Sequence, residues 1–276
     1  MARSEAAQRA IDAAFDGASS YWRDVYGEGS FLATVYGDRQ AVALAWIDEL
    51  DLPDGAAVLE VGCGAGFLTV ALARRGYRVD AIDSSDAMVA STRARIAETG
   101  VAAHATATVD DVHRLAARDG AYAAVVALGV LPWLHAPARA VRELARVVAP
   151  GGAVVVTADN RARLNFVLDP RFNPLLVYPV KRRLKALLGR LGKRPLGVLP
   201  DVCYPGALDR LVRAAGLEPR RRRSVGFGPF TFFGVRLLSE ARSVALHRRL
   251  QRLADRDVPL LRAAGMNAMV LATKPR

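Results

Sequence analysis

The feature that most constrains the fold of this 276-residue chain is a regular alternation of short apolar runs with amphipathic stretches between residues 57 and 157. Short, continuous apolar runs are typical of strands buried on both faces of a parallel sheet, and the stretches between them have helical periodicity. Strands are predicted at 57–61, 78–82, 105–109, 123–128 and 153–157, with helices at 68–75, 86–99 and 136–148. Repeated strand–helix units joined by short turns predict an α/β fold with a doubly wound, mostly parallel sheet.

The alternation breaks after residue 157, which suggests an insertion. Residues 160–204 are predicted to form a helical cap inserted after the fifth strand, and residues 160–200 hold five of the 14 prolines. The pattern then resumes with a helix at 205–216, a strand at 220–227, a helix at 239–255 and a strand at 268–273, which completes a seven-stranded sheet. Residues 1–50 read as two helices with an aromatic-rich link, and we expect them to form a lid on a main domain at 51–276.

The net charge of +12 is concentrated in one segment. Residues 171–223 contain 14 Lys and Arg and three acidic residues, so this segment carries +11 and the rest of the chain is close to neutral. Such a block suits an anionic substrate or anionic lipid headgroups, and equally a solvated basic face. Within it, residues 180–191 predict a basic amphipathic helix, which either caps the active site or lies on an anionic membrane.

The sequence predicts a cytoplasmic protein, with peripheral membrane contact left open. No apolar run is long enough for a transmembrane helix, and the N-terminus lacks the apolar core of a signal peptide. One of the two cysteines, Cys63, lies within a glycine-rich motif, which argues against a structural disulfide with Cys203.

That motif is Glu60-Val-Gly62-Cys-Gly64-Ala-Gly66, at the turn from the first strand into the first helix of the alternation. Glycines at such a turn allow backbone conformations closed to other residues and let a ligand approach the main chain. The spacing differs from the G-x-G-x-x-G of dinucleotide sites, and the acidic Glu60 suits a cationic ligand better than a pyrophosphate. Asp83, 21 residues after Gly62, ends the second strand where a carboxylate can bind both ribose hydroxyls.

These residues resemble motif I and the following acidic position of class I S-adenosylmethionine (SAM) dependent methyltransferases, in the branch similar to the ubiquinone and menaquinone methylases. The resemblance covers roughly residues 55–160 and extends to Asp110-Asp111-Val112 and to Val148-Ala-Pro-Gly-Gly152. It implies a Rossmann-like fold, SAM as cofactor and S-adenosylhomocysteine (SAH) as product. It also implies a set of cofactor-binding residues: Glu60, Gly62, Cys63, Gly64, Gly66, Asp83, Ser84, Met88, Asp111, Val112, Leu128 and Gly129.

In that set the resemblance implies specific contacts. The three glycines would line the methionine and ribose portions of SAM, Leu128 and Gly129 would pass close to the methionine portion, and Asp83 would hold the ribose diol. Met88 would lie near the adenine, with Asp111 at its amino group and Asp110 as the alternative to Asp111.

Methyl transfer from a sulfonium is an in-line displacement, which depends largely on proximity and orientation. A general base helps when the acceptor is a hydroxyl, and His135 is the predicted base, with capping of the next helix as its alternative role. Substrate contacts are predicted for Tyr21, Tyr26, Trp133 and Asn160, and Trp22 lies in the same aromatic stretch. No metal site is predicted, because Leu128-Gly129 supplies no acidic ligand to pair with Asp159-Asn160.

The sequence thus predicts an enzyme that methylates a small molecule, with O-methylation of a lipid-like, quinone-like or secondary-metabolite acceptor as the leading interpretation. An RNA methyltransferase using the basic 171–223 segment is an alternative, although no RNA-binding module is present and nucleic acid is not the expected partner. A non-catalytic, membrane-associated SAM-binding protein is the third possibility. No obligate protein partner is predicted.

Overall fold

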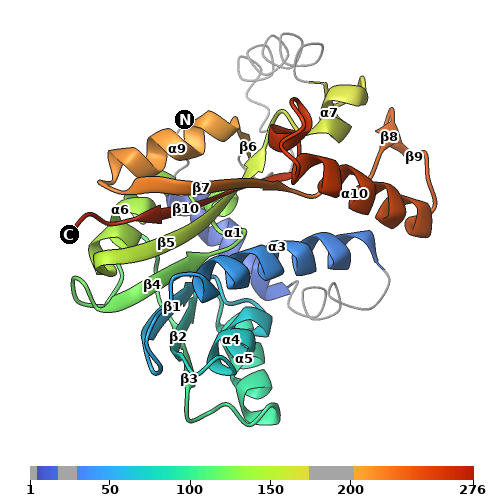
Figure 1. Cartoon of the computed structure of the whole chain (residues 1–276). Coiled ribbons are helices and arrows are strands. Elements are labelled where there is room, and N and C mark those ends of the chain that lie inside the picture. Colours follow the sequence, from blue (N-terminus) through green and yellow to red (C-terminus); the bar gives the residue numbers. More distant parts are fainter. Residues whose placement is uncertain (1–4, 18–29, 174–201) are drawn as a thin grey trace.

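The computed structural model describes residues 5–17, 30–173 and 202–276, and it confirms the predicted α/β architecture (Figure 1). The chain begins with helices α1 (Glu5–Gly17) and α3 (Phe31–Asp48). The alternating part comprises β1 (Ala57–Val61), α4 (Phe67–Ala73), β2 (Arg78–Asp83), α5 (Asp86–Glu98), β3 (Ala105–Val109), β4 (Tyr122–Ala127), the 3-10 helix η1 (Leu131–Trp133), α6 (Pro137–Val147) and β5 (Val148–Asn160). Each of these predicted strands and helices is present, with ends shifted by a few residues.

The remaining elements follow the break in the alternation. They are α7 (Leu164–Leu168), β6 (Val202–Cys203), α9 (Pro205–Ala214), β7 (Glu218–Val225), a hairpin of β8 (Thr231–Phe232) and β9 (Val235–Arg236), α10 (Glu240–Ala254), the 3-10 helix η2 (Leu261–Ala263) and β10 (Asn267–Thr273). Most of the predicted insertion, including the basic amphipathic helix at 180–191, lies outside the described residues. None of the helices described is long and apolar enough to cross a membrane.

Seven strands lie side by side in the order β3-β2-β1-β4-β5-β10-β7, and the short β6 pairs with β5 as an eighth. The strands from β3 to β5 are parallel, whereas β10 runs antiparallel to both β5 and β7. The order reverses between β1 and β4, and such switch points create ligand crevices at the carboxyl ends of parallel strands.

The fifth strand is longer than the predicted 153–157. Its first residue, Val148, already pairs with Tyr122 of β4 before an irregularity in the ladder, and its last residues pair with β10 and β6. Backbone partners on both sides therefore extend the strand beyond its apolar run, as far as Asn160.

Two apolar clusters cover the two faces of the sheet. One joins the sheet to α3, α4 and α5, and the other joins it to α6 and α9 (Figure 1). Alternate residues of the central strands enter opposite clusters: Val126 and Val155 belong to the first, and Val125 and Val154 to the second. These strands are consequently apolar along their whole length, and polar side chains are confined to their ends.

Candidate active site

A cavity of about 870 Å³ lies at the carboxyl ends of the parallel strands and continues to the first residues of β10. This volume is in the upper part of the range of about 300–1,000 Å³ for small-molecule sites. α1 and α3 supply further walls, through residues such as Ile11 and Tyr36. Most of the residues predicted to form the site line it: Glu60, Gly62, Cys63, Gly64, Asp83, Ser84, Met88, Asp111, Val112, Leu128, Gly129, Trp133 and His135.

The glycine turn after β1 requires a glycine at position 62 on steric grounds. Gly62 has a φ of 73°, and a Cβ placed on it would lie 2.4 Å from Cγ2 of Val130. Any side chain at this position would therefore force the Val130 side chain, just after β4, to move, and it would also strain the backbone. Gly66, by contrast, is not among the cavity-lining residues; it is the N-cap residue of α4, with a φ of 79°, and packs against Thr92 of α5.

Asp83 ends β2 with its carboxylate held by main-chain amides. The Gly64 amide donates to Oδ2 at 3.0 Å and the Ser85 amide donates to Oδ1 at 3.1 Å. Burial raises the pKa of Asp83 above its ordinary value, although these amides oppose the shift. The carboxylate is thereby fixed in orientation and faces the cavity beside Met88.

Glu60 is a buried carboxyl in the wall of the cavity, only 4% exposed. Thr69 of α4 donates a hydrogen bond of 2.5 Å to its Oε2. Burial raises the pKa of Glu60 to about 8, and the nearby Asp83 adds to the shift. At neutral pH the side chain is therefore mostly protonated until a cation approaches it.

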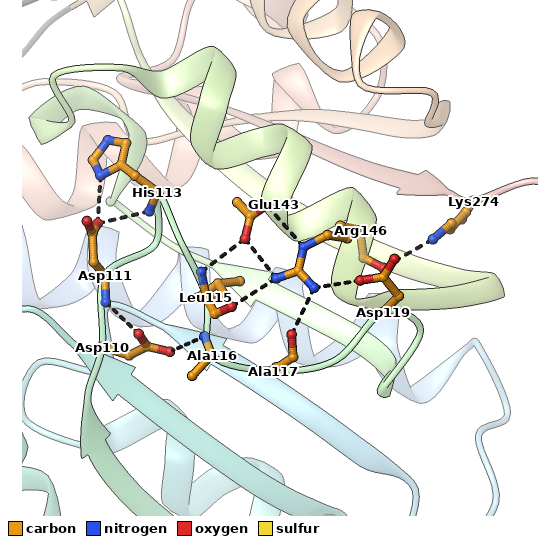
Figure 2. A network of polar contacts seen from close by, with 10 residues as sticks. All are labelled: Asp110, Asp111, His113, Leu115, Ala116, Ala117, Asp119, Glu143, Arg146 and Lys274. Carbon is orange, nitrogen blue, oxygen red and sulfur yellow. Dashed lines mark hydrogen bonds and ion pairs between the residues drawn. The ribbon is translucent and has the colours of Figure 1, made fainter.

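The loop after β3 carries Asp111 and is fastened by a polar network (Figure 2). The Oδ1 atom of Asp111 accepts hydrogen bonds from the main-chain amide and Nδ1 of His113, at 2.9 and 2.7 Å. Arg146 of α6 donates to the carbonyls of Leu115 and Ala117, which ties the loop to the helix. Burial raises the pKa of Asp111, but the bonds from His113 outweigh it, so the pKa lies below the ordinary value.

His135 lies at this same end of the cavity. Its ring is 4.0 Å from the His113 ring between centroids, and its main-chain amide donates to Oε1 of Gln8 in α1 at 2.9 Å. The arrangement places His135 beside Asp111, at the β3 end of the row of strands. The role of His135 as the catalytic base stays a prediction.

Arg39 of α3 is a cavity residue that the sequence did not reveal. Its side chain is 9% exposed, it forms no ion pair with the described residues, and its Nε has no hydrogen-bond partner there. The guanidinium lies against Gly129, where a Cβ would be 2.9 Å from Nη1. The Asp159 carboxylate is near enough to feel the charge of Arg39 but forms no direct ion pair with it. The guanidinium therefore keeps hydrogen-bonding capacity for an anionic group in this part of the cavity.

Comparison with known proteins identifies the family. A model described as "Methyltransferase domain" matches residues 58–152. The ubiquinone biosynthesis O-methyltransferase of Alkalilimnicola ehrlichii is 32% identical over 225 residues, which cover 79% of this chain and 81% of that protein. That of Pseudomonas paraeruginosa is 33% identical over 70% of this chain and 78% of its own. The chain is a class I SAM-dependent methyltransferase.

Solved structures show the same fold at lower identity. Magnesium protoporphyrin IX methyltransferase from Synechocystis PCC 6803, with bound SAH, superposes with a TM-score of 0.66 at 14% identity, covering 97% of this chain and 99% of that one. A crystal structure of a [4+2]-cyclase superposes with a TM-score of 0.56 at 23% identity, over 86% and 80% of the two chains. These likenesses confirm the Rossmann-like architecture of the methyltransferase.

The cavity of this methyltransferase fits SAM. The row of strand ends offers a fixed carboxylate at Asp83 for a ribose diol, a glycine-lined passage at Gly62 and Gly129, and a buried carboxyl at Glu60 for an ammonium group. Arg39, the buried cation beside Gly129, would be the positive partner of a methionine carboxylate.

Asn160, predicted to contact the substrate, is placed elsewhere. It is fully buried and is not among the cavity-lining residues. Its Nδ2 donates to the carbonyls of Ala263 and Gly265, both at 2.8 Å, and its Oδ1 accepts from the amide of Ala162. The side chain therefore fastens the end of β5 to the loop before β10, and the structure gives no support to the predicted substrate contact.

Among the aromatic residues predicted to contact the substrate, only Trp133 lies in the described part of the chain. It lines the cavity and meets Phe15 of α1 edge to face, with 5.1 Å between ring centroids. Tyr21, Trp22 and Tyr26 lie outside the described residues. Among the residues that the structure describes, no group of three or more His, Cys, Asp or Glu side chains is arranged to hold a metal ion.

The arginines that motivated an RNA-binding interpretation, 220–223, lie on β7 and are ion-paired. Their partners, in chain order, are Glu218, Glu49, Asp209 and Asp255. β7 is at the end of the row of strands opposite to β3, on the edge of the sheet. Side chains already paired within the protein offer a poor surface for phosphates, so this segment does not favour RNA as the acceptor.

Proposed function

We propose that this methyltransferase methylates a hydroxyl group of an apolar, quinone-like aromatic acceptor. The observation that carries the proposal is the extent of the similarity to the ubiquinone biosynthesis O-methyltransferases, which spans 79% of the chain and so reaches well beyond the SAM-binding half. The cavity supports it, because Phe15, Tyr36 and Met266 give it an aromatic and apolar wall.

In this proposal, residues at different strand ends bind different parts of SAM. Asp83 and the loop after β3 hold the adenosine portion, with Met88 at the adenine. Glu60 and Arg39 hold the amino and carboxylate groups of the methionine portion, between β1 and β4. When bound, SAM supplies an electrophilic methyl group on a sulfonium. The protein orients this group toward the region beyond β4, where the acceptor binds, and α1 excludes water on the opposite side.

The proposal is tested with purified protein, SAM and three acceptors: a prenylated ortho-dihydroxybenzene, the matching amine and total cellular RNA. We expect SAH to form only with the dihydroxybenzene, together with a product heavier by one CH2 whose fragmentation places the methyl on oxygen. SAH formation with the amine or with RNA alone would overturn it.

We further propose that the protein contacts an anionic membrane surface peripherally. Phe232, Phe233 and Val235 of the β8–β9 hairpin are all more than half exposed, and Leu168 of the adjacent α7 is 58% exposed. Arg171 lies against the hairpin at Gly234, so a cation accompanies the apolar side chains. Apolar side chains beside a cation suit a membrane rich in acidic lipids, which is also where a prenylated acceptor would reside.

A further inference from the structure

A second polar cluster lies one strand further along the cavity than the residues assigned to SAM. β5 follows β4 in the sheet, and its Asp159 is the register partner of Asn267, the first residue of β10. Nδ2 of Asn267 donates a 2.8 Å hydrogen bond to Oδ1 of Asp159. Both residues line the cavity, as does Arg163, four residues beyond Asp159. The cluster therefore occupies the end of the cavity beyond the methionine position.

This cluster has unused hydrogen-bonding capacity. Oδ2 of Asp159 accepts no hydrogen bond from the described residues, and the buried Oδ1 of Asn267 has no partner among them. The Arg163 guanidinium lies 3.5 Å from the centroid of the Phe166 ring, and its buried Nε is likewise unpartnered in the described part of the chain. Asn267 is 5% exposed, so its polar atoms are held in place rather than solvated. Unsatisfied buried polar groups of this kind mark a place where a polar ligand group completes the hydrogen bonds.

We propose that Asp159 accepts the proton of the hydroxyl that is methylated, and that Arg163 stabilises the oxygen as it becomes anionic; this inference rests on the proposed O-methylation. The O–H bond of the acceptor breaks and its proton moves to Oδ2 of Asp159. The electron pair left on oxygen forms the bond to the methyl carbon, and the pair of the broken carbon–sulfur bond stays on sulfur. Asn267 is a positioning residue, because it holds the other carboxylate oxygen of Asp159.

The environment of Asp159 supports a role in proton transfer. Burial raises the pKa of its carboxyl, and the positive charges of Arg163 and Arg39 oppose this only in part. A carboxylate with a raised pKa is a stronger base than an exposed one, which favours uptake of a proton from a phenol. His135, the other titratable candidate, lies beside Asp111 at the β3 end of the cavity.

The experiment compares Asp159→Asn with the wild type on two acceptors, 4-methylcatechol and 4-nitrocatechol, the second of which is already largely ionised at neutral pH. General base catalysis contributes about 10²–10⁴-fold, so we expect a loss of that size in kcat on 4-methylcatechol. The loss on 4-nitrocatechol is expected to be much smaller for methylation of the hydroxyl para to the nitro group, since that oxygen is already ionised and needs no base. Glu218→Gln on β7, which changes an exposed acid in the same way, is the matched control and is expected to lose nothing.

A second measurement does not depend on turnover. The absorbance of 4-nitrocatechol reports its ionisation when it binds to SAH-loaded protein. We expect Arg163→Gln to weaken binding of the ionised form about tenfold and to raise the pH at which the bound compound ionises, while SAH affinity is retained.

The outcomes separate this inference from the proposed function. If the wild type methylates neither catechol, both the hydroxyl acceptor and the role of Asp159 are overturned. If it methylates both and Asp159→Asn loses equally on each, Asp159 serves only to balance the charge of the arginines. If the variant loses nothing on either acceptor, the inference fails and O-methylation stands.

Discussion

Glu60 is a buried acid whose ionisation we expect to be coupled to the binding of a cationic ligand. Its pKa of about 8 means that the free protein holds a proton here at pH 7, and the ammonium group of SAM favours the ionised form. We therefore expect SAM binding to release close to one proton at pH 7 and SAM affinity to rise with pH up to about 8. Calorimetry in two buffers of different ionisation enthalpy counts the protons, and Glu60→Gln is expected to release none.

The same residue predicts how stability without ligand depends on pH. An acid whose pKa is raised by folding binds more protons in the folded than in the unfolded state between its two pKa values, so stability falls as pH rises from about 4.5 to about 8. Glu60→Gln removes the charge and should flatten this part of the profile. If the melting temperatures of the wild type and of Glu60→Gln depend equally on pH, the pKa of Glu60 is not raised by folding.

Arg39 allows a sharper test, because its proposed partner is one end of SAM. A hydrogen-bonded pair with a charged group contributes about 1.5–3 kcal/mol, so Arg39→Met is expected to weaken SAM and SAH binding by about 10–100-fold. Methylthioadenosine shares the nucleoside but lacks the carboxylate, and its affinity should be unchanged. A parallel loss for all three ligands would show that Arg39 supports the fold of the cavity rather than the methionine carboxylate.

At the scale of elements, α1 is attached to the cavity rim through three of its own side chains. Gln8 accepts from the His135 amide, Oγ of Ser84 donates to Asp12, and Phe15 meets Trp133 edge to face. An aromatic pair of this geometry contributes about 0.5–1.5 kcal/mol beyond burial. Phe15→Ala is expected to speed SAH release by about 2–10-fold in stopped-flow displacement. Ala13→Ser, on the exposed side of the same helix, is the control and should leave the release rate unchanged.

The elements also show which parts of the site a sequence can reveal. The glycine turn and Asp83 were predictable, because each lies at the end of a strand that the local sequence already identifies. Asp159 was not singled out as a site residue, and its neighbour Asn160 was. Successive side chains in a strand point to opposite faces, so an error of one residue moves the contact from the cavity to the loop before β10.

Residues brought in by distant elements lacked any local signal. Arg39 lies in a helix before the first strand, and Asn267 reaches Asp159 only because β10 is antiparallel to β5. The packing of α3 on the sheet decides the contact of Arg39, and the strand order decides that of Asn267. A pattern of apolar runs predicts that strands exist without fixing their neighbours. The fold class was therefore predictable, whereas the acceptor end of the cavity depended on the topology.

For the molecule as a whole, the exposed hairpin makes membrane contact testable. Phe232 and Phe233 are 52% and 60% exposed. A phenyl ring contributes about 1.5–3 kcal/mol when fully buried, so replacing both with Ser is expected to weaken binding to phosphatidylglycerol vesicles at least about tenfold in co-sedimentation. Tyr204→Ser, at an equally exposed aromatic beside α9, should bind as the wild type does. Because the hairpin is separate from the cavity residues, the double variant should methylate a water-soluble catechol at the normal rate. Unchanged sedimentation of the double variant would mean that these rings do not enter the lipid.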